Sequence, residues 1–96
     1  MAVKILIKRM VPASRARDLM PLFRRLRNLA MDQPGYISGE TLERIDRPGE
    51  YLVISTWNSL IDWKKWEADK ERQEIQSQID SLLRASSVHR IFAYDE

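Results

Sequence analysis

Three tryptophans, Trp57, Trp63 and Trp66, lie within ten residues of one another in a chain of 96 residues. Large aromatic side chains dominate small cores, so packing alone could explain them. A group this dense also favours a flat, apolar cavity wall that holds a planar aromatic ligand by stacking. Under this second interpretation, Trp57, Trp63 and Tyr51 bind substrate and Trp66 belongs to the catalytic site.

The chain has a single histidine, His89. A histidine side chain titrates near neutral pH, which suits a general base that removes a proton from a bound substrate. A lone histidine is more often structural, so both roles stay open. If His89 is the catalytic base, Tyr51 or Tyr94 would be its hydrogen-bonding partner.

Several kinds of chemistry are excluded by absent residues or motifs. With no cysteine, the chain has no disulfide, thiolate nucleophile or cysteine-based metal site. It also lacks the HExxH, GxSxG, P-loop and GxGxxG motifs. One histidine with scattered carboxylates does not make a ligand set, so we predict no metal and no cofactor.

Composition and charge limit the partners. The longest purely apolar run, residues 51–54, is far too short to span a membrane, and no secretory signal is recognised. We therefore expect a cytoplasmic protein with no membrane partner. Residues 1–30 hold eight basic side chains and one acidic one. These basic residues are spread around the solvent side of a predicted helix, so nucleic-acid binding is not expected.

The first half of the chain predicts a strand, a helix and a strand. Residues 2–11 alternate as a strand, and an apolar stripe from Leu19 to Ala30 predicts a helix with Ser14 as its N-cap. Pro21 should kink this helix or divide it into a short turn and a main helix. Residues 36–46 predict a strand with a bulge or close approach at Gly39, followed by a turn at 47–50.

The second half predicts a strand, a helical region and a last strand. Residues 51–57 form the clearest strand and are apolar on both faces. Asn58 or Ser59 should cap the next helix, with Asp62 in a position like that of a capping box. A break is expected near 68–69, before a second helical stretch that carries Ile75, Ile79, Leu82 and Leu83. Residues 88–94 should be the last strand.

This order of elements predicts the fold class and an assembly. One domain, 1–96, with the order β-α-β-β-α-β is a ferredoxin-like α+β fold. It has a four-stranded antiparallel sheet with both helices on one face. The other face should be polar in a monomer, but the strands are apolar on both sides. A second copy is the simplest cover, so we expect a homodimer that packs sheet against sheet.

Several of these residues also carry a family resemblance. Gly35-Tyr36 after the first helix, the strand end Ser55-Thr56-Trp57-Asn58-Ser59, and then Trp63 and Trp66 resemble the antibiotic biosynthesis monooxygenase family. The resemblance spans almost the whole chain and implies a dimeric α+β barrel. Some members oxidise phenolic, anthrone or quinol substrates with dioxygen and without metal or flavin. Others degrade haem.

The resemblance extends to single residues only in part. Polyketide-oxidising members have a tryptophan where Trp57 stands, an asparagine where this chain has Val53, and a tyrosine where it has Trp63. Haem-degrading members have a tryptophan that matches Trp66. Their first-strand asparagine falls at Lys8 or Arg9, and their haem-ligating histidine falls at Gln76. An amide does not replace an axial imidazole, so haem degradation is disfavoured.

Two hypotheses therefore remain. The first is a cofactor-independent monooxygenase that acts on an aromatic or quinol-type small molecule with dioxygen. The alternative is a non-catalytic dimeric module that binds or senses a small aromatic molecule in the same cavity. Val53 favours the alternative, because the amide of the oxidising members is missing there.

Overall fold

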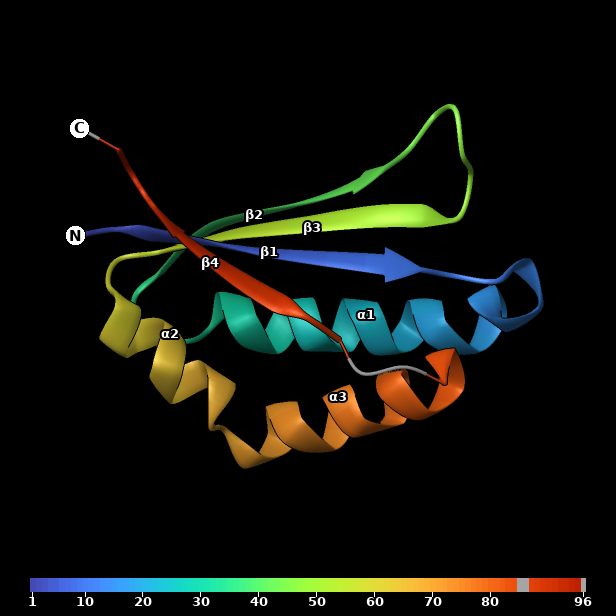
Figure 1. Cartoon of the computed structure of the whole chain (residues 1–96). Helices are drawn as coiled ribbons and strands as arrows, with labels where there is room; N and C mark the ends of the chain where they lie inside the picture. Colours follow the sequence, from blue (N-terminus) through green and yellow to red (C-terminus); the bar gives the residue numbers. More distant parts are fainter. Residues whose placement is uncertain (85–86, 96) are drawn as a thin grey trace.

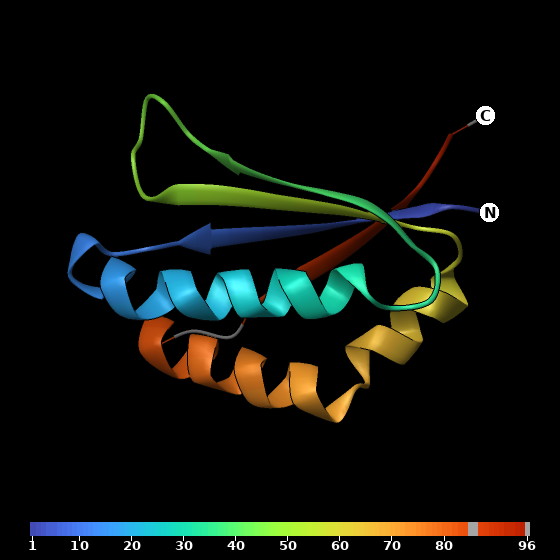
Figure 2. The ribbon, with the colours of Figure 1, turned by 180° about the vertical axis from the view of Figure 1, so that it is seen from behind.

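The computed structural model describes residues 1–84 and 87–95. The strands are β1 (Val3–Met10), β2 (Tyr36–Glu43), β3 (Glu50–Trp57) and β4 (His89–Ala93). The helices are α1 (Ala16–Met31), α2 (Leu60–Glu67) and α3 (Lys70–Leu83), with a 3-10 turn at Ala13–Arg15. The strands form one antiparallel sheet in the order β2-β3-β1-β4, and the helices lie on one side of it (Figure 1, Figure 2). This confirms the predicted ferredoxin-like α+β fold.

Strand β1 lies between β3 and β4 in the sheet, and the alternation of its residues explains which face the helices cover. Val3, Ile5 and Ile7 alternate along it and are all buried against the helices. The same alternation places Arg9 on the helix side. Opposite these residues on β3 lie Trp57, Ser55, Val53 and Tyr51. The period-two pattern therefore carries apolar residues at one end of the helix-covered face and an arginine at the other.

Helix α1 differs from the sequence prediction in two respects. Ser14 is not its N-cap: it lies in the 3-10 turn, and the helix begins at Ala16 after an Arg15 whose side chain makes no capping hydrogen bond. Pro21 does not divide the helix, which runs unbroken to Met31. Pro21 is exposed, so the carbonyl group that lacks a donor lies on the side of the helix where water can bind it.

The β2–β3 hairpin is irregular near its start. The register shifts between Tyr36 and Ser38, so the bulge predicted at Gly39 lies two residues earlier. Gly39 does make a close approach, because a Cβ atom there would lie 2.5 Å from the Tyr36 hydroxyl oxygen. Strand β2 ends at Glu43 instead of Asp46. In the connecting turn Gly49 has a φ of +97°, which a glycine adopts without steric cost.

The predicted helical break after the third tryptophan is confirmed. Ser59 caps α2, and its hydroxyl accepts a hydrogen bond from the Asp62 amide at 3.1 Å. Helix α2 ends at Glu67, and Asp69 caps α3 by accepting from the Arg72 amide at 3.0 Å. The two caps fix where the helices start, and so they fix where Trp63, Trp66 and Arg72 point.

None of the described helices covers the other face of the sheet (Figure 1). Leu6, Leu52 and Ile54 alternate with residues of the helix side. Leu42 and Phe92 are 48% and 50% exposed. The predicted apolar residues therefore do lie on this face, but the register places charged residues among them, Lys4, Lys8, Glu40 and Arg90. None of the described helices is long and apolar enough to cross a membrane.

Candidate functional site

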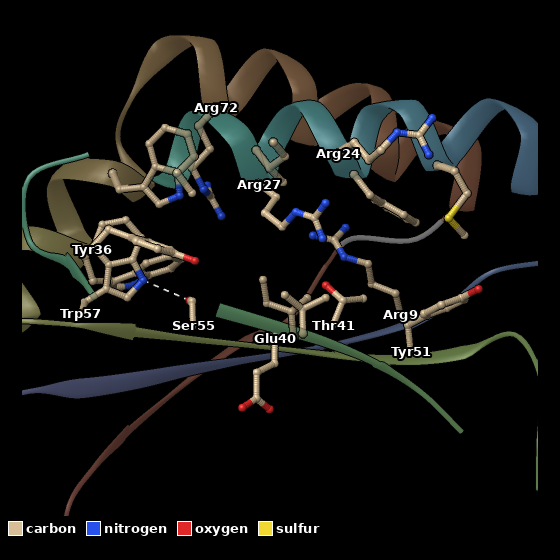
Figure 3. Close-up of a pocket in the computed structure, with 18 residues that line it drawn as sticks. Arg9, Arg24, Arg27, Tyr36, Glu40, Thr41, Tyr51, Ser55, Trp57 and Arg72 are labelled. Atoms are coloured by element: carbon tan, nitrogen blue, oxygen red, sulfur yellow. Dashed lines mark hydrogen bonds between the residues drawn. The ribbon is translucent and has the colours of Figure 1, made fainter. Parts of the chain in front are cut away.

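A cavity of about 180 Å³ lies between the helix-covered face of the sheet and the helices (Figure 3). Strands β1, β2 and β3 form its floor, and all three helices contribute to its walls. Its volume is slightly larger than the ~150 Å³ that holds a benzene-sized molecule in a protein interior. The lining comprises Ile7, Arg9, Met20, Phe23, Arg24, Leu26, Arg27, Ala30, Tyr36, Glu40, Thr41, Tyr51, Val53, Ser55, Trp57, Trp63, Trp66 and Arg72.

The three tryptophans form one end of this cavity. Trp57, Trp63 and Trp66 are 0%, 2% and 4% exposed and pack with Val3, Ile5 and Ile7 in one core cluster. The Trp57 and Trp63 rings meet at 64° with centroids 5.7 Å apart, so the two indoles do not form a parallel stack. The tryptophans are therefore core residues and cavity wall at the same time.

Hydroxyl groups lie along the floor. Trp57 Nε1 donates to Ser55 Oγ at 3.0 Å, which satisfies this buried indole. The Tyr36 ring stands at 90° to Trp57 with centroids 5.4 Å apart, and its hydroxyl extends into the cavity (Figure 3). Tyr51 lies farther along β3, next to Arg9 of β1. Desolvation and the neighbouring Glu43 carboxylate raise the pKa of Tyr51, so the phenol stays a hydrogen-bond donor.

The opposite end is built around Arg9. This side chain is only 4% exposed, and its guanidinium group lies 4.8 Å from the centroid of the Phe23 ring. Among the described residues, nothing accepts a hydrogen bond from its Nη1 atom. Burial lowers the pKa of Arg9 to about 10, which leaves it charged at neutral pH. The cavity therefore contains a buried cation.

Arg72 adds a second buried guanidinium group, 5% exposed, from the first turn of α3. Its Nη1 donates to the Glu67 carbonyl oxygen at 3.3 Å, and its Nη2 donates to His89 Nε2 at 2.7 Å. The group also lies 5.3 Å from the centroid of the Trp63 ring. Burial lowers the pKa of Arg72. The side chain thus joins the tryptophan end of the cavity to His89.

His89 lies behind Arg72 and is absent from the cavity lining. Its ring is 5.7 Å from the Trp63 ring. Desolvation, followed by the charges of Arg72 and Arg9, lowers the pKa of His89 to about 4, so the imidazole is neutral at pH 7. Because Nε2 accepts from Arg72, the ring proton is assigned to Nδ1. The structure therefore connects His89 to the cavity through Arg72.

The other positions weighed from sequence are also placed. Val53 lies in the floor, where it presents an aliphatic side chain to the cavity. Gln76 is outside the lining, and its amide donates to Asp80 and Ser87 at 2.9 and 2.8 Å. No group of three or more potential metal ligands occurs in the part of the chain that the structure describes.

The structure brings together Trp57, Trp63, Trp66 and Tyr51, and it adds three residues that sequence reasoning missed. Arg9 could have been found by extending the alternation of Val3, Ile5 and Ile7 by one step. Arg72 gave no such signal, and Tyr36 stood out only as part of the family resemblance. Their positions depend on the Asp69 cap and on the bulge at the start of β2, which arise from the folded chain.

Comparisons of structure give the fold. A conserved protein from Methanosarcina mazei Go1 superposes with a TM-score of 0.90 at 15% identity, covering 99% of this chain and 94% of the other. SnoaB, a cofactor-independent oxygenase from Streptomyces nogalater, gives 0.85 at 19% identity with 99% and 94% covered. Rv0793 from Mycobacterium tuberculosis gives 0.87 at 17% identity with 100% and 97% covered.

Comparisons of sequence give the family. No curated protein sequence matches the chain significantly. The sequence profile described as "Antibiotic biosynthesis monooxygenase" matches residues 2–78, which include most of the cavity-lining elements. The chain therefore belongs to the antibiotic biosynthesis monooxygenase family.

Proposed function

We propose that this chain is a cofactor-independent monooxygenase that oxidises a phenol or hydroquinone of one or two rings with dioxygen. The cavity carries the proposal: it lies between sheet and helices, is walled by indole and phenol rings, and has a volume of about 180 Å³. The family, and the likeness to an oxygenase described as cofactor-independent, support the reaction class.

The proposed reaction needs no external reductant. The substrate hydroxyl loses its proton, and the resulting phenolate gives one electron to dioxygen. A carbon–oxygen bond then forms at an ortho or para ring carbon that bears hydrogen. When the oxygen–oxygen bond breaks, this carbon loses its hydrogen and becomes a carbonyl, and water is released. One oxygen atom enters the product, and the substrate supplies all four electrons that reduce dioxygen.

The protein has to bind, orient and shield such a substrate. Trp57, Trp63 and Trp66 would hold the apolar body of the substrate and exclude water. The Tyr36 hydroxyl lies where it can bond a substrate oxygen (Figure 3). His89 is the sequence-based candidate for the base. Its contact with Arg72 Nη2 at 2.7 Å favours a role in positioning that guanidinium group.

Oxygen uptake tests this function. The purified protein is supplied with benzene hydroquinones, naphthols and anthrones in the presence of a chelator. We expect uptake above the autoxidation rate for the one- and two-ring compounds, unaffected by the chelator. Val53→Phe should abolish it, because the larger side chain would occupy the cavity floor. Ile61→Phe, a matched change at a side chain of α2 that is 68% exposed, should retain it.

The non-catalytic alternative gives a different result. A binding module would quench its tryptophan fluorescence with the same compounds, and Val53→Phe would remove this quenching. It would consume no oxygen above the blank. Uptake that persists unchanged in folded Val53→Phe protein would place the reaction outside the cavity and contradict the proposal.

We also propose that the chain forms a homodimer through the open face of the sheet. Leu6, Leu42, Ile54 and Phe92 lie on this face, and Leu42 and Phe92 are about half exposed. Light scattering after gel filtration should give about twice the 11.3 kDa of one chain. Ile54→Lys should give a monomer with an unchanged far-UV spectrum. A monomeric wild-type protein would contradict this assembly.

A further inference from the structure

The two buried guanidinium groups of the cavity lack acidic partners. Arg9 and Arg72 are 4% and 5% exposed. Within residues 1–84 and 87–95, neither forms an ion pair with a carboxylate. Arg72 makes three neutral contacts, to a carbonyl oxygen, an imidazole and an indole ring. A buried charge without a counter-ion is costly to a folded protein, so the arrangement calls for an explanation.

The nearby acidic side chains act on these guanidinium groups only from a distance: within the described residues, Asp80 favours the charged form of Arg9, and Glu67, Asp80 and Asp69 that of Arg72, but none forms an ion pair with either. Glu40 is the one carboxylate among the lining residues, and its side chain points away from the cavity through the floor (Figure 3). Asp80 accepts hydrogen bonds from Gln76 and from Ser87. Glu67 pairs with Lys64 at 3.2 Å. The charged side chains that line the cavity and do not point away from it are therefore all arginines.

Two further arginines strengthen this charge at the opening. Arg24 and Arg27 of α1 line the cavity but are solvent-exposed. In Figure 3 the Arg27 side chain extends from α1 toward the space into which Arg9 rises from the sheet. Exposed cations at a cavity mouth raise the local concentration of anions and speed their entry.

Two donors of the lining also lack acceptors. In the described part of the chain, Arg9 Nη1 and Trp63 Nε1 are buried without a hydrogen-bond partner. Buried donors in native proteins almost always have an acceptor, from protein, water or ligand. Both residues line the cavity, so an acceptor inside it could satisfy them.

We infer that the cavity binds its aromatic ligand as an anion, with a phenolate or carboxylate oxygen at Arg9 and the ring against the tryptophans. This inference deepens the proposed function by naming the charge state of the substrate. It rests on that function only for the assumption that the cavity is the substrate site. Arg72 and the Trp63 N–H group would add positive potential and a second donor near the ring.

An anion site also accounts for how a substrate could ionise here. No imidazole lines the cavity, and the one lining carboxylate points out of it. A guanidinium group beside a phenol stabilises the charged form, so the phenol releases its proton to water without a general base in contact with it. The proton leaves with solvent, and the electron pair stays on the phenolate oxygen next to Arg9.

The first test compares two ligands that differ in charge. Calorimetric titrations use naphthalene-2-carboxylate and the uncharged naphthalene-2-carboxamide as probes. We expect the carboxylate to bind at least about tenfold more tightly. Arg9→Met keeps an unbranched side chain but removes the charge, and it should reduce this ratio to about twofold or less. Arg17→Met, a matched change at an exposed arginine of α1, should leave the ratio unchanged.

The second test addresses the phenolate. The ionised form of 4-nitrophenol absorbs at a longer wavelength than the neutral form, so its titration can be followed while it is bound. We expect the pKa of the bound phenol to fall by about one unit, and the shift to disappear in Arg9→Met protein. If the pKa of bound 4-nitrophenol falls but the carboxylate binds no more tightly than the amide, the site binds phenolates. If the carboxylate binds more tightly but the pKa of the phenol does not fall, the site binds carboxylates.

Three results would overturn the inference. One is equal affinity for the carboxylate and the amide together with an unshifted nitrophenol. The second is a ratio of carboxylate to carboxamide affinity that is unchanged in Arg9→Met protein. The third is no binding of either probe, or of nitrophenol, at millimolar concentration. Because none of these readouts needs turnover, charge selectivity without oxygen uptake would uphold the anion site and reject the oxygenase. Oxygen uptake without preference for the carboxylate over the carboxamide would uphold the oxygenase and reject the anion site.

Discussion

The two ends of the cavity differ in the side chains that form them: one end is mainly aromatic and aliphatic, and the other is built around a buried arginine. At one end Trp57, Trp63 and Trp66 are buried among aliphatic residues of β1, and the Trp57 N–H group is satisfied by Ser55. At the other end Arg9 is equally buried, yet its Nη1 atom has no acceptor among the described residues. The first end is mainly apolar packing, with Arg72 against Trp63 and the Trp63 N–H group lacking an acceptor among the described residues, whereas the second is built around a buried charge.

This difference separates stability from function. Apolar burial stabilises the folded state, whereas an uncompensated buried charge opposes it. Proteins keep such costly arrangements mainly where a ligand or a reaction needs them. We therefore expect changes at the tryptophan end to alter stability first, and changes at the arginine end to alter binding first. The predictions that follow can break or sharpen this contrast.

The largest effect is expected from Trp57→Ala. Trp57 is fully buried and contacts both Tyr36 and Trp63, so truncation should lower the free energy of unfolding by about 3–5 kcal/mol. Urea denaturation followed by circular dichroism measures the change. Trp57→Phe, which keeps an aromatic ring, should lose clearly less. A loss below about 1 kcal/mol for Trp57→Ala would show that this end is not the core.

The contrast between the two ends predicts that Arg9→Met changes the free energy of unfolding in the opposite direction to Trp57→Ala. Replacing a buried charge by an apolar side chain of similar length should leave the protein as stable or raise the free energy of unfolding by about 1–4 kcal/mol. The same denaturation experiment measures it. Arg9→Lys keeps the charge and should show no such gain. If Arg9→Met destabilised the protein as strongly as Trp57→Ala, the two ends would not differ.

A smaller effect is expected from acid titration of His89. Desolvation lowers its pKa from 6.5 to about 4 in the folded state, with the Arg72 charge as a second cause. Between these values the unfolded chain binds more protons, so the free energy of unfolding falls as the pH falls. The contribution is complete above pH 6.5 and is lost as the pH drops toward 4. Allowing for solvent screening, we expect a loss of about 1–2 kcal/mol.

The control for this pH dependence is His89→Gln. An amide oxygen can still accept from Arg72, but it does not titrate. Denaturation of the variant between pH 7 and pH 4 should therefore show a shallower loss of stability than that of the wild type. Identical pH profiles for the two proteins would mean that carboxylates, and not His89, set the acid sensitivity.

The smallest effect is predicted for Arg24→Met at the cavity mouth. Arg24 is exposed, so its removal should change the free energy of unfolding by less than about 0.5 kcal/mol. It should weaken binding of naphthalene-2-carboxylate by about two- to threefold at low salt, and less at high salt because exposed charges are screened. If Arg24→Met weakened binding of naphthalene-2-carboxylate as much as Arg9→Met does, the anion would bind at the cavity mouth and not at Arg9.

Much of the fold could be predicted from local patterns. The alternation along β1, the apolar run of β3, a cap at Asn58 or Ser59 and the break before Lys70 are all visible in short windows of sequence. Ser14 is not the N-cap and Pro21 does not divide α1, whereas Gly39 makes the predicted close approach although the bulge lies two residues earlier. Packing of the apolar stripe holds α1 continuous through Pro21, and the contact between Tyr36 and Gly39 depends on the hairpin register.

The candidate site could be predicted only in part. The tryptophans stand out by type and spacing, and the structure places all three at one cavity. Arg72 and Arg9 lie 63 positions apart in the sequence, and no local pattern reports that both enter the same space. His89 drew attention by its titration range, but it does not line the cavity and contacts Arg72, which does.

A crystal structure of the protein with naphthalene-2-carboxylate would test the central claim most directly. The account predicts the naphthalene rings against Trp57, Trp63 and Trp66, with a carboxylate oxygen within hydrogen-bond distance of Arg9 Nη1. A ligand in the reverse orientation, with its carboxylate among the tryptophans, would contradict the account. A ligand bound on the open face of the sheet, with the cavity empty, would contradict it equally.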